Sequence, residues 1–289
     1  MLRNIKGIFS AKRVNMGGIY LDQALPIAEL EQLDPFLLIH HWNQTLEGGQ
    51  KQKEVGVGPH PHRGFSPVTL IYKGSVHHRD SRGMDSIVRE GGAQWMNSGM
   101  GIVHSERPDA ELAEKGGNFE IIQFWVNTPA KYKMLEPEYY PMDKSSIPEV
   151  ISEDGKVSLG IIAGAINGIN RKSKTNTELL ICKITANKDG KMLVNVPEDY
   201  NAMIYQLDGE LLINHSFTSR SKNLVWFKNI GDQISLEGRK DSRAVLLAGK
   251  PIGEEVTTYG SFVMNNQTEI LTAIRDYQQG KMGILIEEF

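Results

Sequence analysis

Short apolar runs separated by turn residues are the feature that most limits the folds open to this chain. The sequence contains 29 glycines, and glycine, asparagine, aspartate or proline commonly bounds the apolar runs. The runs themselves are rich in β-branched and aromatic residues, which is typical of strands. Clear examples lie at residues 68–72, 121–126, 202–205, 210–213 and 244–248. Short strands at this spacing predict a sandwich or a small barrel.

The length and one proline-rich stretch predict two domains. A chain of 289 residues is long enough for two domains of ordinary size. Residues 129–149 contain four prolines and many polar residues, which is typical of a connection. We therefore predict a first domain at 1–133, a connecting segment at 134–149 and a second domain at 150–289.

Two further patterns refine this organisation. Residues 69–74 and 203–209 are similar, since each is an apolar strand that ends at a turn glycine, and this weak repeat favours two copies of one architecture. Near the C-terminus, apolar residues at helical spacing precede Gly280 and predict a short amphipathic helix at about 268–279. These residues are Ile270, Leu271, Ile274 and Tyr277.

Composition excludes several classes of protein. Apolar residues make up 40% and charged residues 23%, so the chain can bury real cores and is not disordered. The single cysteine, Cys182, forms no internal disulfide. A net charge of −3 offers no bulk attraction to nucleic acid or to an anionic membrane. The chain lacks a signal-peptide pattern and a long apolar run, so we expect a soluble cytoplasmic protein.

Histidine is distributed unevenly, and its spacing predicts a metal site. Seven of the eight histidines lie between His40 and His104. His60 and His62 are two residues apart, as are His104 and Glu106, and in a strand such pairs point to the same face. Two pairs on facing strands would direct three imidazoles and one carboxylate at one point, which suits a divalent transition metal with open positions for substrate or O₂. The alternative for the first pair alone is a turn with exposed imidazoles.

The same residues lie in motifs that resemble the pirin family of the cupin superfamily. The N-terminal motifs are GPHPHRGF (58–65), His78-Arg-Asp80 and GAQWMNSGMGIVHSE (92–106), and further similarity covers 33–41 and 250–270. The resemblance implies an all-β bicupin, in which two antiparallel β-barrel domains pack face to face. It also implies metal ligands at His60, His62, His104 and Glu106. Iron(II) is the metal that the family favours, and nickel, manganese, cobalt, copper or zinc are the alternatives.

The second domain is expected to bind no metal. Aligning the turn glycines Gly74 and Gly209 places Asn195 and Pro197 where His60 and His62 stand. Neither residue supplies an imidazole.

One position departs from the family pattern. Pirins commonly carry a glutamate directly after HPHRGF, whereas this chain has Ser66. A serine cannot act as a base near neutral pH, so Glu106 or His78 is the candidate for that role. His78 shares a strand face with Asp80, which also allows a supporting role beside the ligands.

Two functions follow from the resemblance. The first is a metal-dependent dioxygenase of the quercetin 2,3-dioxygenase type, acting with O₂ on a small aromatic substrate of the flavonol class. The second is a non-catalytic, redox-sensitive regulatory binding protein that acts as a transcription coregulator or modulates a metabolic enzyme. Apolar residues are candidates for a substrate wall, and two polar residues are candidates for orienting the ligands. The apolar group is Phe36, Phe65, Trp95, Met96 and Phe124, and the polar pair is Arg63 and Gln94.

Overall fold

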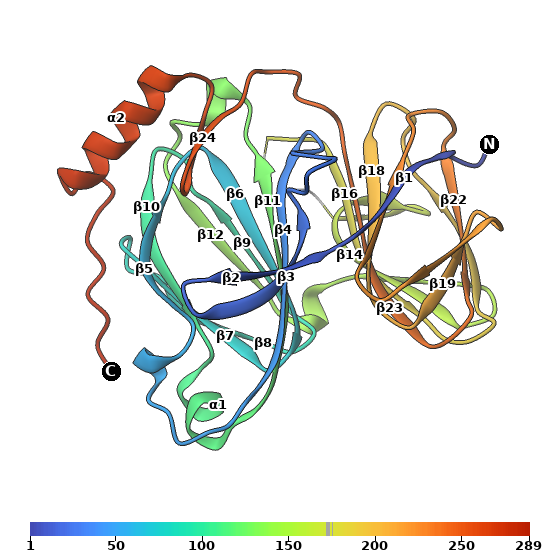
Figure 1. The fold of residues 1–289 in the computed structure, drawn as a ribbon, viewed down its shortest axis with the longest axis horizontal. Helices are drawn as coiled ribbons and strands as arrows, with labels where there is room; N and C mark the ends of the chain where they lie inside the picture. Colours follow the sequence, from blue (N-terminus) through green and yellow to red (C-terminus); the bar gives the residue numbers. More distant parts are fainter. Residues whose placement is uncertain (172–173, 175) are drawn as a thin grey trace. The chain divides into compact units, whose positions relative to one another are not determined.

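Antiparallel strands make up most of the regular structure. The computed structural model describes residues 1–171, 174 and 176–289 (Figure 1). Within that part the α-helices are α1 (Ala110–Lys115) and α2 (Gln267–Gln278), and short 3₁₀ turns lie at Gln52–Glu54, Ala130–Tyr132 and Lys144–Ser146. None of the helices in these residues is long and apolar enough to cross a membrane.

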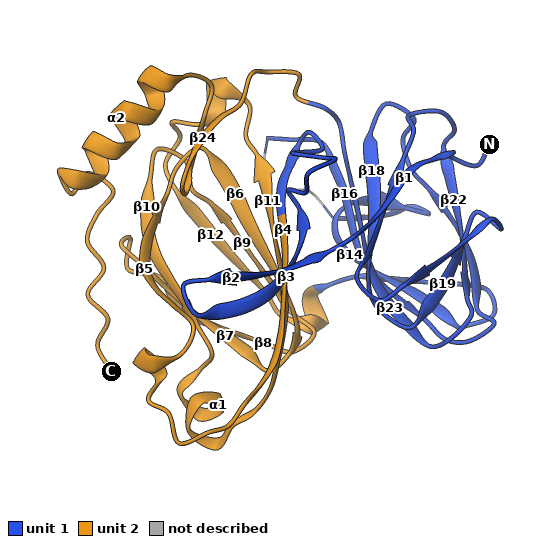
Figure 2. Ribbon diagram, viewed as in Figure 1, with its two compact units in different colours: residues 1–38, 147–251 blue, residues 39–146, 252–289 orange. Residues whose placement is uncertain are grey.

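The chain divides into two compact units, and each unit combines two separate segments (Figure 2). Unit 1 comprises residues 1–38 and 147–251, and unit 2 comprises residues 39–146 and 252–289. Each compact unit includes a segment from the other end of the chain. The contiguous domain boundaries 1–133 and 150–289 remain a prediction.

Unit 2 contains two antiparallel sheets. The smaller sheet has the order β5–β10–β7–β8, and the larger one includes β12–β9–β6–β11–β4. The smaller sheet consists of β5 (Val57–His62), β10 (Ile102–Arg107), β7 (Ser75–Asp80) and β8 (Asp85–Arg89). The larger sheet includes β12 (Glu138–Met142), β9 (Ala93–Asn97), β6 (Phe65–Lys73), β11 (Gly117–Asn127) and β4 (Phe36–Leu46). The β12 strand lies inside the predicted connecting segment 134–149, so part of that segment is sheet.

Unit 1 repeats this topology. Its smaller sheet has the order β17–β22–β19–β20, and its larger sheet includes β1–β21–β18–β23–β16–β14–β13. The smaller sheet consists of β17 (Lys191–Asn195), β22 (Gln233–Gly238), β19 (Glu210–Ile213) and β20 (Phe217–Arg220). The larger sheet includes β1 (Ile5–Ser10), β21 (Asn223–Phe227), β18 (Asn201–Asp208), β23 (Ser242–Gly249), β16 (Leu179–Ala186), β14 (Val157–Ile166) and β13 (Glu149–Ile151), and β15 (Ile169–Arg171) pairs with β14.

The matching strand orders establish an all-β fold with two domains of one design. Within the described residues, the two sheets of each unit are separate rather than joined into one continuous closed barrel. The remaining strands form the hairpins β2 (Lys12–Met16) with β3 (Ile19–Leu25) and β24 (Thr257–Tyr259) with β25 (Phe262–Met264).

The C-terminal helix is confirmed, with its ends one residue from the predicted ones. The Asn266 side chain accepts a hydrogen bond from the Glu269 backbone N–H and caps the first turn. Ile270 and Ala273 are fully buried in an apolar cluster with Met264 and other residues of unit 2. Leu271, by contrast, is 58% exposed, because it lies at the edge of the apolar face.

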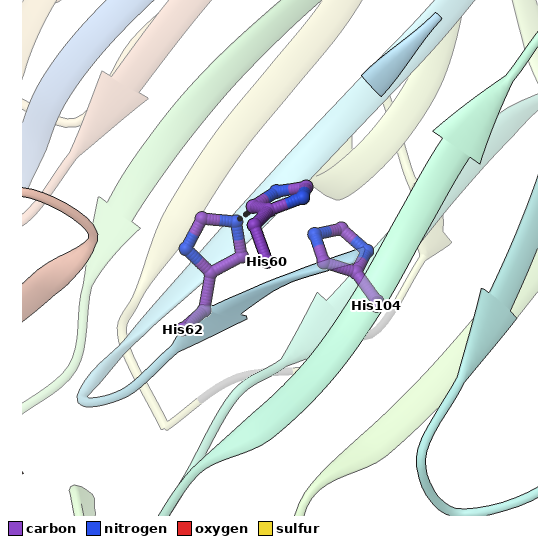
Figure 3. A group of neighbouring side chains, drawn as sticks. All are labelled: His60, His62 and His104. Carbon is purple, nitrogen blue, oxygen red and sulfur yellow. Dashed lines mark hydrogen bonds between the residues drawn. The ribbon is translucent and has the colours of Figure 1, made fainter. Parts of the chain in front are cut away.

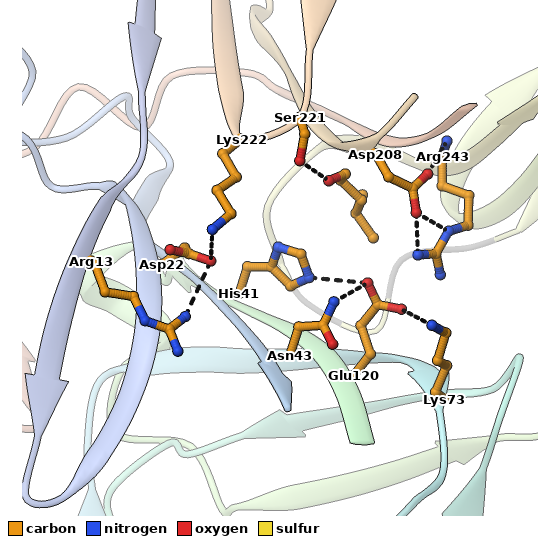
Figure 4. Close-up of polar contacts among 11 residues, drawn as sticks. Arg13, Asp22, His41, Asn43, Lys73, Glu120, Asp208, Ser221, Lys222 and Arg243 are labelled. Carbon is orange, nitrogen blue, oxygen red and sulfur yellow. Dashed lines mark hydrogen bonds and ion pairs between the residues drawn. The ribbon is translucent and has the colours of Figure 1, made fainter. Parts of the chain in front are cut away.

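Figure 4 shows two buried carboxylates outside the histidine cluster, Glu120 and Asp22, with their polar partners. In unit 2, Glu120 accepts hydrogen bonds from His41 and Asn43, both at 3.2 Å. In unit 1, Asp22 forms ion pairs with Arg13 and Lys222. Such pairing offsets the cost of burying a charge.

Candidate metal centre

Three of the predicted ligands meet at one point (Figure 3). His60 and His62 lie on β5 and His104 on β10, and one ring nitrogen from each lies within 4.8 Å of the other two. The strand register explains this convergence, because His60 stands directly opposite His104 and His62 shares the face of His60. Among the described residues, this arrangement matches the i, i+2 prediction for the three histidines.

The hydrogen bonds of β5 direct two nitrogen lone pairs toward each other. Nδ1 of His60 lies 2.8 Å from the Gly58 carbonyl oxygen, and Nδ1 of His62 lies 3.4 Å from that of Ser261. A carbonyl oxygen only accepts, so we assign the ring protons to the Nδ1 atoms. The two Nε2 atoms then present lone pairs to each other at 3.1 Å. A cation between them relieves that repulsion.

His104 provides a third unpaired nitrogen. Its Nε2 atom is buried and has no hydrogen-bond partner among the described residues. Burial, together with the nearby His60 and His62, holds the pKa of His104 well below its usual range. Burial and then His60 lower the pKa of His62 in the same way. Neutral imidazoles with free lone pairs are the form that binds metals, so this donor set fits a transition metal ion.

Glu106 lies on the same strand face as His104, but its carboxylate is outside the group of three nitrogens. Three side chains donate to it: Thr69 Oγ1 at 3.1 Å and Gln94 Nε2 at 2.5 Å to Oε1, and Gln123 Nε2 at 2.7 Å to Oε2. The carboxylate is therefore held firmly, and Oε2, with a single donor, is the oxygen with more capacity for a metal. Its role as the fourth ligand stays a prediction.

Aromatic residues fix the orientation of the two glutamines. The Tyr139 hydroxyl donates to Gln94 Oε1 at 2.9 Å, and the Trp125 indole donates to Gln123 Oε1 at 3.3 Å. Each amide oxygen is thus occupied, so each amide nitrogen points to Glu106. Sequence reasoning found Gln94 and missed the other contacts. Alternation along β6 and β11 could have indicated Thr69 and Gln123, whereas Tyr139 lies in the segment assigned to a connection.

His78 is enclosed between neighbouring rings. It is fully buried, stacks on Tyr139 with ring centroids 3.9 Å apart, and lies 5.2 Å from the His104 ring. Its Nε2 atom lies 2.9 Å from Asp80 Oδ2. This placement is that of a supporting residue beside a ligand, and a catalytic role for His78 or Glu106 stays a prediction.

Ser66 lies on the other face of its sheet. Thr69 stands opposite Gln94 and Gln123 in the register of β6, whereas Val68 stands opposite Trp95 and Phe124. Ser66 shares the Val68 face, is fully buried and donates to Asn97 Oδ1 at 2.8 Å. A side chain at position 66 therefore points away from Glu106, and a glutamate there would not supply a base to the centre.

The alternation of side chains along the strands also shows which of the predicted aromatic wall residues face the histidines. Trp95 and Phe124 share the Val68 face, so the structure places them away from the centre. Phe65 lies 5.0 Å from the His62 ring, and Trp125, which sequence reasoning missed, lies 5.6 Å from it. Arg63 binds Asp276 and the Met100 carbonyl rather than Glu106. Phe65 and Trp125 therefore lie beside His62.

The corresponding strand of unit 1 presents apolar side chains to its core. Met192, Val194 and Val196 belong to the buried cluster of that unit, whereas Asn195 and Pro197 are exposed. The turn-glycine alignment therefore selected outward positions, because it was shifted by one residue relative to the inward face. The inward residues still offer no imidazole or carboxylate, and the absence of a metal there stays a prediction.

The comparisons with known proteins decide the family. The family model for pirin matches residues 18–126, and the model for the pirin C-terminal cupin domain matches residues 181–283. The chain belongs to the pirin family. Pirin-like protein 2 of Arabidopsis thaliana is 33% identical over 293 residues, which cover 99% of this chain and 87% of that protein.

Solved structures agree with this assignment. The crystal structure of a quercetin 2,3-dioxygenase from Acinetobacter baumannii has a TM-score of 0.92 and 30% identity, and the match covers 99% of this chain and all of that one. A bacterial pirin from Escherichia coli, solved in complex with nickel(II), has a TM-score of 0.63 and 20% identity, covering 85% and 99% of the two chains. The latter likeness shows the shared cupin fold alone.

Proposed function

We propose that this chain is a metal-dependent dioxygenase that cleaves flavonol-type aromatic substrates with O₂. The ligands in this proposal are His60, His62, His104 and Glu106. The observation that carries it is the convergence of three imidazole nitrogens beside a firmly held carboxylate. The likeness to a structure described as a quercetin 2,3-dioxygenase supports the reaction class.

A bound divalent ion would act as a Lewis acid, lowering the pKa of a coordinated substrate hydroxyl and orienting substrate and O₂ for ring cleavage with release of carbon monoxide. The protein's own residues prepare this site. Buried and uncharged, His62 and His104 keep their lone pairs available at neutral pH. The donors around Glu106 hold its carboxylate in one orientation.

Substrate access is supported by three inward-facing side chains that are not fully buried. His60, Gln123 and Trp125 lie on the interior face, yet each keeps part of its surface exposed. The Trp125 ring, with Phe65 only 4.3 Å away, offers a flat apolar surface next to His62. A planar aromatic substrate would stack there with an oxygen directed at the histidines.

The test is O₂ uptake and carbon monoxide release by the purified protein, loaded separately with Fe(II) and Ni(II). We expect turnover with a flavonol, none with the matching flavone that lacks the 3-hydroxyl group, and background rates for His104→Ala. His215→Asn is the matched control, because His215 is exposed and belongs to unit 1. No O₂ consumption by fully loaded protein with any flavonol would overturn the proposal and favour the regulatory binding protein.

A further inference from the structure

Three buried side chains, Asp80, His78 and His104, are connected in a row by close polar contacts. Asp80 and His78 lie outside the proposed ligands. Asp80 Oδ2 lies 2.9 Å from His78 Nε2, and His78 Nδ1 lies 3.3 Å from His104 Nδ1. All three side chains are buried, with exposed fractions of 4%, 0% and 1% from Asp80 to His104. The strand register produces this order, because Asp80 stands opposite His104 on the adjacent strands β7 and β10.

The Asp80 carboxylate can only accept hydrogen bonds. Its other oxygen, Oδ1, accepts the backbone N–H groups of Arg82 at 2.8 Å and Met84 at 3.1 Å. Oδ2 therefore accepts the proton on His78 Nε2, and a neutral His78 then has a lone pair on Nδ1. That lone pair accepts the Nδ1 proton of His104. The remaining nitrogen of His104, Nε2, is left with its lone pair directed to the other histidines.

The ring of His78 is also fixed in its plane. Tyr139 stacks on it with an angle of 12° between the ring planes. Two different contributions could therefore hold His104 in place: the hydrogen bonds through His78, or its packing between aromatic rings. A substitution of His78 that keeps only the hydrogen bonds and one that keeps only the ring packing should therefore affect metal affinity in opposite ways.

We propose that Asp80 and His78 are positioning residues that hold His104 in the Nδ1–H form and thereby set the metal affinity of the centre. This inference rests on the proposed metal site, although it does not require the dioxygenase reaction. Groups that orient a ligating histidine typically change metal affinity by about 10- to 100-fold when they are removed.

The experiment measures the affinity of the full-length protein for Ni(II) by competition with a chelator, and the visible spectrum of its Co(II) form. We expect Asp80→Asn to bind Ni(II) about 10- to 100-fold more weakly and to change the Co(II) spectrum. Asp85→Asn is the matched control. Asp85 pairs with His77 at 2.7 Å on the same hairpin, but His77 faces away from the centre, so its loss should leave both readouts unchanged.

Two substitutions of His78 separate hydrogen bonding from packing. His78→Gln can still donate to Asp80 and accept from His104, so we expect near-native Ni(II) affinity. His78→Phe keeps an aromatic ring against Tyr139 but has no hydrogen bond, so it should lose affinity like Asp80→Asn. The reverse order, with His78→Phe native and His78→Gln weak, would overturn the proposal. This pair decides the matter even if Asp80→Asn fails to fold.

The outcome also separates this inference from the proposed function. Tight Ni(II) binding by wild type and equal binding by Asp80→Asn and His78→Phe would contradict the positioning role while leaving the metal site intact. Weak binding by these variants, without O₂ consumption by wild type, would retain the positioning role and overturn the dioxygenase.

Discussion

Glu106 shows how much of this centre depends on hydrogen bonds to single atoms. Its carboxylate accepts from Thr69, Gln94 and Gln123, and each contact comes from a position in register across three strands. These donors fix both carboxylate oxygens in place and leave Oε2, which has a single donor, as the oxygen with more capacity for a cation.

Asp80 illustrates the same effect outside the ligand set. Burial alone would raise the pKa of its carboxyl group, but hydrogen bonds from His78 and from the backbone of Arg82 and Met84 outweigh burial and lower it. The Asp80 carboxyl group therefore favours its charged, accepting form beside His78 Nε2.

Substitution of Ser66 tests the assignment of strand faces. Ser66→Glu places a carboxylate on the face of Val68, away from Glu106, so we expect no gain in O₂ uptake and unchanged metal content. The new charge is buried, and the free energy of unfolding should fall by about 2–5 kcal/mol. Urea denaturation measures the stability, and Ser66→Ala is the control without a charge. A folded Ser66→Glu protein with a faster rate near neutral pH would contradict the assignment.

At the scale of elements, β10 connects the centre to the C-terminal segment. His104 and Glu106 point inward, whereas Arg107 points outward and forms two 2.8 Å hydrogen bonds with the carboxylate of Glu287. Arg107 also donates to the carbonyl oxygens of Lys53 and Val55. Both charged side chains are largely buried, at 8% and 6% exposure. This pair therefore holds the C-terminal segment against the outer face of β10.

Glu287→Gln tests this contact. The variant should lose about 2–3 kcal/mol of stability at pH 7, because a hydrogen-bonded buried charge loses its partner. Burial alone would raise the pKa of Glu287, but the hydrogen bonds and the charge of Arg107 outweigh it and lower the pKa. A carboxyl group of lowered pKa stabilises the fold above its unfolded pKa and loses that contribution as pH falls.

The difference between wild type and Glu287→Gln should therefore shrink as pH falls below about 4. Urea denaturation at several pH values measures it. Glu288→Gln, at an exposed neighbouring position, should have no effect. An equal loss of stability in both variants, or a difference that grows in acid, would argue against the ion pair.

At the scale of the whole molecule, the sequence predicted those features that depend on residues close together along the chain. Period-2 spacing predicted the convergence of His60, His62 and His104, and helical spacing predicted α2 nearly to the residue. The exchange of terminal segments between the units could not be predicted, because it depends on contacts between residues far apart in sequence. Tyr139 was missed for the same reason, since it reaches Gln94 only through the pairing of β12 with β9.

The two units share one topology, but their inner faces carry different residues. The inner face of unit 1 is apolar, whereas unit 2 presents histidines on β5 where unit 1 presents Val194 and Val196 on or beside β17. Each unit has many buried apolar side chains of its own. We therefore expect the fold to stay intact when no metal is bound.

Metal content tests the central claim most directly. Elemental analysis of dialysed wild type and of His215→Asn should give about one equivalent of a divalent transition metal per chain. His62→Ala and His104→Ala should give almost none, while circular dichroism shows native β structure in all four proteins. Full metal occupancy in both His62→Ala and His104→Ala would contradict the account, because the ion would then lie elsewhere.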